Sequence, residues 1–145
     1  MRKDSGFTLT ELMVTIAVVA ILASLAIPNF IAWLPNYRLR SGAEEIQSTL
    51  QLARITAIKE NATATVLFDI ANESYRASVA GKTVRRGRMP AGIDINSAAF
   101  GGGTFVQFNN QGFAINNTDG TAQVRNSSGK SKTITVFITG NSRID

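Results

Sequence analysis

The sequence predicts an α+β protein in which one long N-terminal helix, membrane-spanning in its first half and amphipathic in its second half, packs on a small antiparallel β-domain. Three observations support this fold class. An apolar run extends from Phe7 to Ile27, apolar residues then recur at helical spacing from Leu39 to Ile58, and after Asn61 the hydrophobic period changes to two. We therefore divide the chain into residues 1–6 (a charged leader), 7–27 (a membrane-spanning and assembly helix), 28–60 (a kinked and then amphipathic helix) and 61–145 (a β-rich globular domain).

The apolar segment is long enough to cross a bilayer. As a helix, its 21 residues would rise roughly 31 Å at about 1.5 Å per residue, which matches the thickness of the hydrocarbon core. Glu11 is the only formal charge in this span. Because a carboxylate at membrane depth costs about 2.5–3.5 kcal/mol on insertion scales, we expect Glu11 to have a function and a nearby partner.

The charged leader ends in Gly6, immediately before the apolar run, whereas an ordinary secretory signal has its small-residue cleavage site after the run. This layout resembles that of type IV prepilins and type II secretion pseudopilins. The resemblance implies that prepilin peptidase cuts between Gly6 and Phe7 and methylates the new amino terminus at Phe7. It also implies that Glu11, at the fifth mature position, neutralises the amino terminus of a neighbouring subunit during assembly, and that Pro28 interrupts the helix.

Alternatives for this segment stay open. Ser24-Leu25-Ala26 could be the cleavage site of a secretory signal, which would place the mature start at Ile27, but a carboxylate inside the apolar region fits that poorly. Glu11 could instead snorkel to an interface in a plain single-span anchor, which would explain neither Gly6 nor the five-residue spacing. It could also pair with the amino group of its own chain, because residues four apart share a helix face.

Two prolines mark the middle of the predicted helix. Pro28 and Pro35 each remove a helical hydrogen bond, so we expect a kink or local melting across residues 25–36. Trp33 and Tyr37 suit a membrane–water boundary or, alternatively, packing against the globular domain.

The second half of the helix has one apolar stripe at alternating steps of four and three residues. Its members are Leu39, Ala43, Ile46, Leu50, Ala53 and Ala57. We expect Leu52, Ile55 and Ile58 to broaden this apolar side, and the helix to lie across a sheet. A coiled coil is less favoured, because the repeat is short and Gly42 interrupts it.

Period-two patterns predict strands at residues 64–70, 74–79, 104–109, 121–125 and 133–139, with turns at residues 101–103, 110–112, 119–120 and 128–129. Because no helix separates these strands, we expect antiparallel pairing. The segments Phe108–Gly112 and Phe137–Arg143 resemble those of GspH/FimT-type minor pilins, in which Phe-x-x-x-Gly introduces a hairpin and the chain closes on a strand near Gly and Arg. Four Asn-x-Ser/Thr triplets, at Asn61, Asn72, Asn116 and Asn126, are interpreted as surface markers.

Composition limits the chemistry. The sequence has no Cys and no His, which removes thiol ligands and the commonest general base and metal ligand. We therefore predict a protein that is not an enzyme and has no catalytic residues, metal site or cofactor.

The charge of the globular part suggests a second function. Residues 61–145 carry nine Lys and Arg against five Asp and Glu, and basic patches are typical of nucleic-acid binding. The candidate DNA contacts are Arg85, Arg86, Arg88 and Arg143. Some members of the resembled branch bind DNA through a C-terminal Gly-Arg-x-Arg motif, of which residues 140–143 keep only the Gly and the last Arg. A solvated basic loop is the simpler interpretation.

Together, these features and the resemblance predict a structural subunit, a minor pilin or pseudopilin of a type IV pilus or type II secretion pseudopilus. It would be a single-pass inner-membrane protein with its globular domain in the periplasm, and would then enter the filament through its hydrophobic helix. The implied partners are prepilin peptidase, other pilin or pseudopilin subunits and the inner-membrane assembly machinery. The rival hypothesis is a pilus-displayed, DNA-binding minor pilin for natural transformation.

Overall fold

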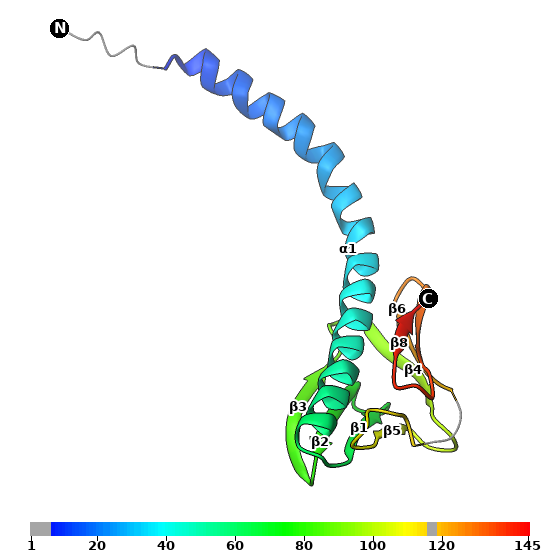
Figure 1. The fold of residues 1–145 in the computed structure, drawn as a ribbon. Coiled ribbons are helices and arrows are strands. Elements are labelled where there is room, and N and C mark those ends of the chain that lie inside the picture. Colours follow the sequence, from blue (N-terminus) through cyan, green and yellow to red (C-terminus); the bar gives the residue numbers. More distant parts are fainter. Residues whose placement is uncertain (1–6, 116–118) are drawn as a thin grey trace, which may run out of the picture. The chain divides into compact units, whose positions relative to one another are not determined.

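The computed structural model describes residues 7–115 and 119–145, and the predicted leader, Gly6 included, lies outside the described residues. Helix α1 is followed by eight strands (Figure 1). Their bounds are α1 Leu9–Lys59, β1 Ala64–Asp69, β2 Ser74–Val79, β3 Lys82–Arg88, β4 Ile93–Ala99, β5 Phe105–Phe108, β6 Gly120–Asn126, β7 Ser131–Val136 and β8 Ser142–Ile144. The chain forms two compact units, which meet between Leu34 and Pro35. The predicted fold class, one long N-terminal helix packed on a small antiparallel β-domain, is confirmed.

The β-domain contains two four-stranded sheets. Their strand orders are β3-β2-β1-β5 and β4-β6-β7-β8, and every pair is antiparallel, as predicted. Within the second unit, α1 runs alongside the strands of the first sheet (Figure 1). In β1 and β2, buried residues alternate with partly exposed or exposed ones, because one face of the sheet lies on the core.

The apolar stripe of α1 forms one wall of the core. Its six predicted members, Leu39, Ala43, Ile46, Leu50, Ala53 and Ala57, are all buried. They belong to one cluster with the inward residues of both sheets, such as Val66 in β1 and Ile134 in β7. Leu52, Ile55 and Ile58, which we expected to broaden the apolar side, are 37%, 62% and 47% exposed and so lie outside the buried stripe. The sheets cover only a narrow strip of the helix.

Helix α1 is uninterrupted across Pro28 and Pro35. The alternative of local melting over residues 25–36 is therefore wrong, since flanking turns of the helix carry the chain past each missing hydrogen bond. A kink at these prolines stays a prediction.

Three strands, β3, β4 and β8, are absent from the strand ranges that the sequence predicts. The segment Lys82–Arg88, interpreted as a basic loop, is strand β3, and residues 93–99 form β4. Neither has a clean apolar alternation: β3 is largely exposed, and the register of β4 shifts between Ile95 and Ser97. Pairing with β2 and β6 supplies the hydrogen bonds that their own side-chain patterns do not predict.

The predicted glycine turn at residues 101–103 is confirmed, because Phe100 and Gly103 exchange backbone hydrogen bonds. One surface marker is wrong. Asn126 is only 3% exposed, and its side-chain oxygen accepts hydrogen bonds from the backbone N–H groups of Ser128 and Lys130. The marker at Asn116 lies outside the described residues.

The two glycine segments noted in the sequence meet in the structure. Phe108–Gly112 closes a tight turn in which the Asn109 side chain accepts hydrogen bonds from the N–H groups of Gln111 and Phe113. Gly140, in the β7–β8 turn, packs directly against the backbone of Gly112. Arg54 of α1 donates to the Gly112 carbonyl at 3.0 Å and to the Asn141 side chain at 2.8 Å. One helix side chain therefore holds together a turn from each sheet.

Replacement of Gly140 tests this junction against a matched control. Gly140 and Gly129 have nearly the same φ, 80° and 81°, but a Cβ on Gly140 would lie 1.8 Å from the Gly112 carbonyl oxygen, whereas nothing lies within 4 Å of Gly129. Both alanine variants carry left-handed backbone strain of about 1–2 kcal/mol. We expect Gly140→Ala to lower the free energy of unfolding by at least about 1 kcal/mol more, because overpacking adds about 1–3 kcal/mol.

The measurement is urea unfolding of the fragment 35–145, which contains every buried apolar residue of the described chain. Equal losses for Gly140→Ala and Gly129→Ala would show that the contact between the two turns does not contribute to stability.

Candidate assembly site

The first turn of α1 contains a reciprocal cap that uses Glu11. The Glu11 carboxylate accepts hydrogen bonds from the Thr8 backbone N–H at 2.9 Å and from the Thr8 hydroxyl at 2.8 Å. In return, the Glu11 N–H donates to the Thr8 hydroxyl oxygen at 3.2 Å. This arrangement is a capping box, in which the residue before the helix and the third helical residue satisfy each other's free backbone donors.

Thr8 is a site residue that the sequence analysis missed. The signal was present, because Thr8-Leu9-Thr10-Glu11 matches the pattern Ser/Thr-x-x-Glu that precedes an apolar helix. The cap shows that Glu11 has a partner within its own chain when residue 7 is still joined to the leader. Pairing of Glu11 with an amino terminus stays a prediction.

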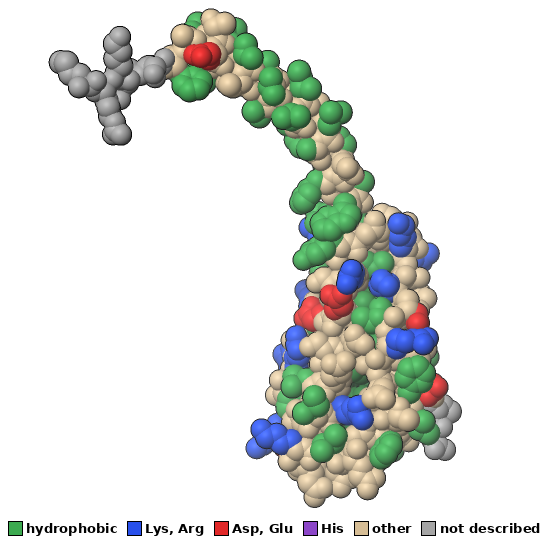
Figure 2. All heavy atoms as spheres, turned by 45° about the horizontal axis from the view of Figure 1, so that its top comes forward, with side chains coloured by type: hydrophobic (Ala, Val, Ile, Leu, Met, Phe, Trp, Pro, Cys, Tyr) green, Lys and Arg blue, Asp and Glu red, His purple; other side chains and the backbone are tan. Residues whose placement is uncertain are grey.

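The segment that follows the cap offers an apolar surface on every side. No residue from Phe7 to Leu34 is buried, and its hydrophobic side chains are visible all along the exposed helix (Figure 2). The hydroxyls of Thr15 and Ser24 donate to the backbone carbonyls of Leu12 and Ile21, so these polar groups need no other partner. Among the described residues, α1 is the one helix long and apolar enough to cross a membrane.

Aromatic residues occur near the end of this segment. The Phe30 and Trp33 rings lie 6.5 Å apart at an interplanar angle of 42°. Trp33 and Tyr37 are each 54% exposed. Their placement at a membrane–water boundary or against the globular domain stays a prediction.

The four candidate DNA contacts do not form one patch. Arg86 and Arg88 lie on the outer face of the sheet β3-β2-β1-β5 and are exposed. Arg85, directly before Arg86, points to the opposite face and donates to the Ser48 hydroxyl of α1 at 3.2 Å. Arg143 lies on β8 of the other sheet and forms an ion pair with Asp145 at 2.8 Å. Alternation of side chains along β3 separates Arg85 from Arg86 and Arg88, and Arg143 is separate because β8 belongs to the other sheet.

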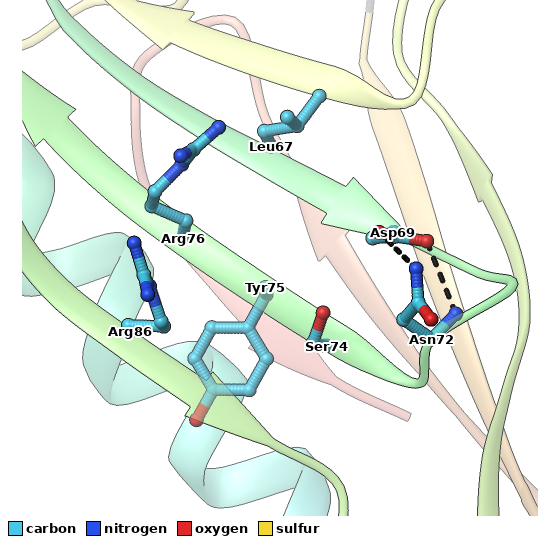
Figure 3. Close-up of a pocket in the computed structure, with 7 residues that line it drawn as sticks. All are labelled: Leu67, Asp69, Asn72, Ser74, Tyr75, Arg76 and Arg86. Carbon is cyan, nitrogen blue, oxygen red and sulfur yellow. Dashed lines mark hydrogen bonds between the residues drawn. The ribbon is translucent and has the colours of Figure 1, made fainter.

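Arg76 joins Arg86 on the outer face, which the sequence analysis did not foresee. The two residues are cross-strand partners in β2 and β3, and both line a hollow of about 380 Å³ with Leu67 and Asp69 of β1 (Figure 3). Asp69 accepts two hydrogen bonds from Asn72, which lower the pKa of its carboxyl group. Neither ion pair found among the described residues involves Arg76, Arg86 or Arg88.

On the buried face of this sheet, Tyr75 of β2 packs against β3. Its ring reaches from β2 toward β3 and covers Gly87, where an added Cβ would lie 2.1 Å from the phenol oxygen (Figure 3). Burial raises the pKa of Tyr75 well above its ordinary value, so the phenol stays neutral. Gly87 therefore supplies the space that the aromatic ring occupies.

Among residues 7–115 and 119–145, no group of three or more acidic side chains comes together that could hold a metal ion. The chain also lacks His and Cys.

Comparison with known proteins agrees with the geometry. The N-terminal methylation motif of prokaryotes matches residues 1–27, and the type II transport protein GspH family matches residues 42–140. The chain is 43% identical over 49 residues to the type IV major pilin PilA of Myxococcus xanthus, covering 34% of this chain and 20% of that protein. It is 35% identical over 80 residues to the type IV wide pilus major component PilA4 of Thermus thermophilus, covering 55% of this chain and 52% of that protein. The matches thus span about half or less of these relatives.

Solved structures share the fold at low identity. The type IV minor pilin FimU of Pseudomonas aeruginosa has a TM-score of 0.62 at 18% identity, over 76% of this chain and 90% of that structure. The minor pseudopilin EpsH from the type 2 secretion system of Vibrio cholerae has a TM-score of 0.58 at 11% identity, over 74% of this chain and 96% of that structure. Because the family match covers most of the chain and extends across both sheets, the chain belongs to the type II transport protein GspH family and carries the prokaryotic N-terminal methylation motif.

Proposed function

We propose that this chain is a structural subunit, a minor pilin or pseudopilin, of a type IV pilus or type II secretion pseudopilus. The observation that carries the proposal is the helical segment 9–34, apolar on all sides, with one carboxylate in its first turn. A helix that is apolar all round is stable only in lipid or in a protein core. The relatives named above support the same role, since they are pilins and pseudopilins.

The subunit first resides in the inner membrane, with the domain 35–145 in the periplasm and the leader at the cytoplasmic face. The motif that matches residues 1–27 supports processing by prepilin peptidase between Gly6 and Phe7, followed by methylation of Phe7. The mature segment then leaves lipid for a bundle of like helices. Inner-membrane assembly proteins and other pilin or pseudopilin subunits are the partners of this step.

Glu11 changes partner during this transfer. In lipid, the capping box satisfies its carboxylate by hydrogen bonds but leaves its charge unneutralised. In the filament, the amino terminus of a neighbouring subunit supplies the opposite charge. The assembled state is favoured because the free-energy cost of an unneutralised carboxylate in lipid is removed. The domain 35–145 forms the outer surface of the filament.

Processing gives the first test of this proposal. Gly6→Val should leave the full-length precursor in the membrane, because a branched side chain next to the cut does not fit where glycine fitted. Intact-mass analysis should show that the wild-type protein begins at a methylated Phe7. A wild-type start at Ile27 would instead establish a secretory signal and refute the proposed cleavage.

Two substitutions separate the charge of Glu11 from its capping role. Glutamine can also complete a capping box, so Glu11→Gln should retain the helix start and insert into membranes at least as well as the wild type. Without the negative charge, incorporation into sheared filaments should nevertheless fall about tenfold, as it should for Glu11→Ala. Normal incorporation of Glu11→Gln together with a defect in Glu11→Ala would assign Glu11 to capping alone.

Thr8→Ala provides the matched control for that experiment, with Thr10→Ala as a nearby neutral change. Loss of the cap should cost about 1 kcal/mol of helix stability, yet the charge of Glu11 remains, so filament incorporation should stay near the wild-type level. A filament defect in Thr8→Ala as large as that in Glu11→Gln would contradict the charge mechanism.

A further inference from the structure

The outer face of the first sheet concentrates positive charge beside an open strand edge. Arg76 lies opposite Arg86 in the β2–β3 pair, and Arg88 follows two residues along β3, roughly 6.6 Å away on the same face. All three side chains are exposed and belong to no ion pair of the described residues. Asp69, the one acidic residue that lines the hollow, is already bonded to Asn72. The surface therefore has unmatched positive charge.

Hollows on this face have room for side chains of a partner. The one beside Arg76 and Arg86 measures about 380 Å³ (Figure 3), and a neighbouring hollow of about 460 Å³ lies across β1, β2, β3 and β5. Hydroxyl and amide side chains line the second one: Thr65, Ser78, Thr83 and Gln107. Planar guanidinium groups match carboxylates in a two-point geometry, so the face suits acidic side chains in particular.

Strand β3 is the edge of its sheet. In the part of the chain that the structure describes, it pairs only with β2. Its outward backbone N–H and C=O groups can therefore be satisfied by a further strand. Only a polypeptide can form that ladder, which favours a peptide over a nucleic acid as the occupant. A second copy of β3 is disfavoured, because Lys82, Arg86 and Arg88 would meet like charges.

We propose that the edge of β3, together with the arginine face of Arg76, Arg86 and Arg88, binds an extended acidic segment of a different protein by strand addition. The backbone ladder would supply the alignment, and the arginines would select carboxylates on alternate residues. This inference concerns the globular domain, and it stands whether or not the chain enters a filament.

Binding of a labelled ten-residue peptide of alternating Glu and Thr to the full mature chain, in nanodiscs of zwitterionic lipid, tests the proposal by fluorescence anisotropy. The triple variant Arg76→Gln, Arg86→Gln, Arg88→Gln should weaken binding at least tenfold. The control variant Arg125→Gln, Lys130→Gln, Lys132→Gln removes the same charge from β6, β7 and the turn between them, and should weaken binding less than threefold. Equal weakening in the two variants would show that peptide binding depends only on the net charge of the protein, which would overturn the proposal.

A second peptide tests strand addition. It keeps the five Glu residues but replaces the Thr residues by Pro, which cannot donate to a ladder, so its affinity should be at least tenfold lower. Equal affinity of the two peptides would overturn the edge-pairing mechanism. A ten-nucleotide oligothymidylate of similar length is the third probe. The oligonucleotide could bind more tightly than the Glu–Thr peptide, and the triple variant of Arg76, Arg86 and Arg88 could lose binding of the oligonucleotide and not of the peptide. In that case the face is a nucleic-acid surface and the proposal fails.

Discussion

Burial of one narrow stripe of α1 is the constraint on which the rest of the globular domain depends. The stripe from Leu39 to Ala57 joins the inward residues of both sheets in a single core cluster, so the helix and the two sheets share one core. Three of its members are alanines, Ala43, Ala53 and Ala57, and the neighbouring Gly42 is also buried, so small side chains leave the strands room to approach the helix. Replacement of a large member such as Ile46 or Leu50 by Ala would leave a cavity and lower the free energy of unfolding by about 2–5 kcal/mol.

Hydrogen bonds of α1 fix the position of the helix relative to the two sheets. Arg54 reaches a turn from each sheet, Arg85 of β3 reaches Ser48, and Arg38 donates to the Ala91 carbonyl before β4. These bonds lie along the margins of the buried stripe, where the helix leaves the core. These hydrogen bonds hold the sheets against the helix at several points along its length. Gly112 and Gly140 allow the two turns beside Arg54 to pack closely against each other.

One helix thus serves two environments by a change in its pattern. From Leu9 to Leu34 it is exposed on every side and suits lipid or a bundle of like helices, whereas from Leu39 onward one face belongs to the folded domain. Glu11 is costly in the first environment unless it finds a partner, and the capping box with Thr8 is the partner that a single chain provides. In the proposed assembly, the amino terminus of a neighbouring subunit would offer Glu11 a full opposite charge.

The sequence by itself determined the fold class, the apolar segment, the buried stripe and five of the strands, because these depend on hydrophobic periods that local residues carry. Tertiary structure decided the rest. Strands β3 and β4 form because they pair with β2 and β6, and neither has a hydrophobic period of its own that would predict a strand. The helix residues Leu52, Ile55 and Ile58 belong to the apolar side in the sequence but lie outside the strip that the sheets cover.

The basic residues show the same division. Composition revealed an excess of positive charge after residue 60, but only strand alternation and sheet order could separate Arg85 and Arg143 from Arg86 and Arg88 and bring Arg76 beside Arg86. The physical reason is that a side chain's face is set by the register of its strand, and register is fixed by partners distant in the sequence.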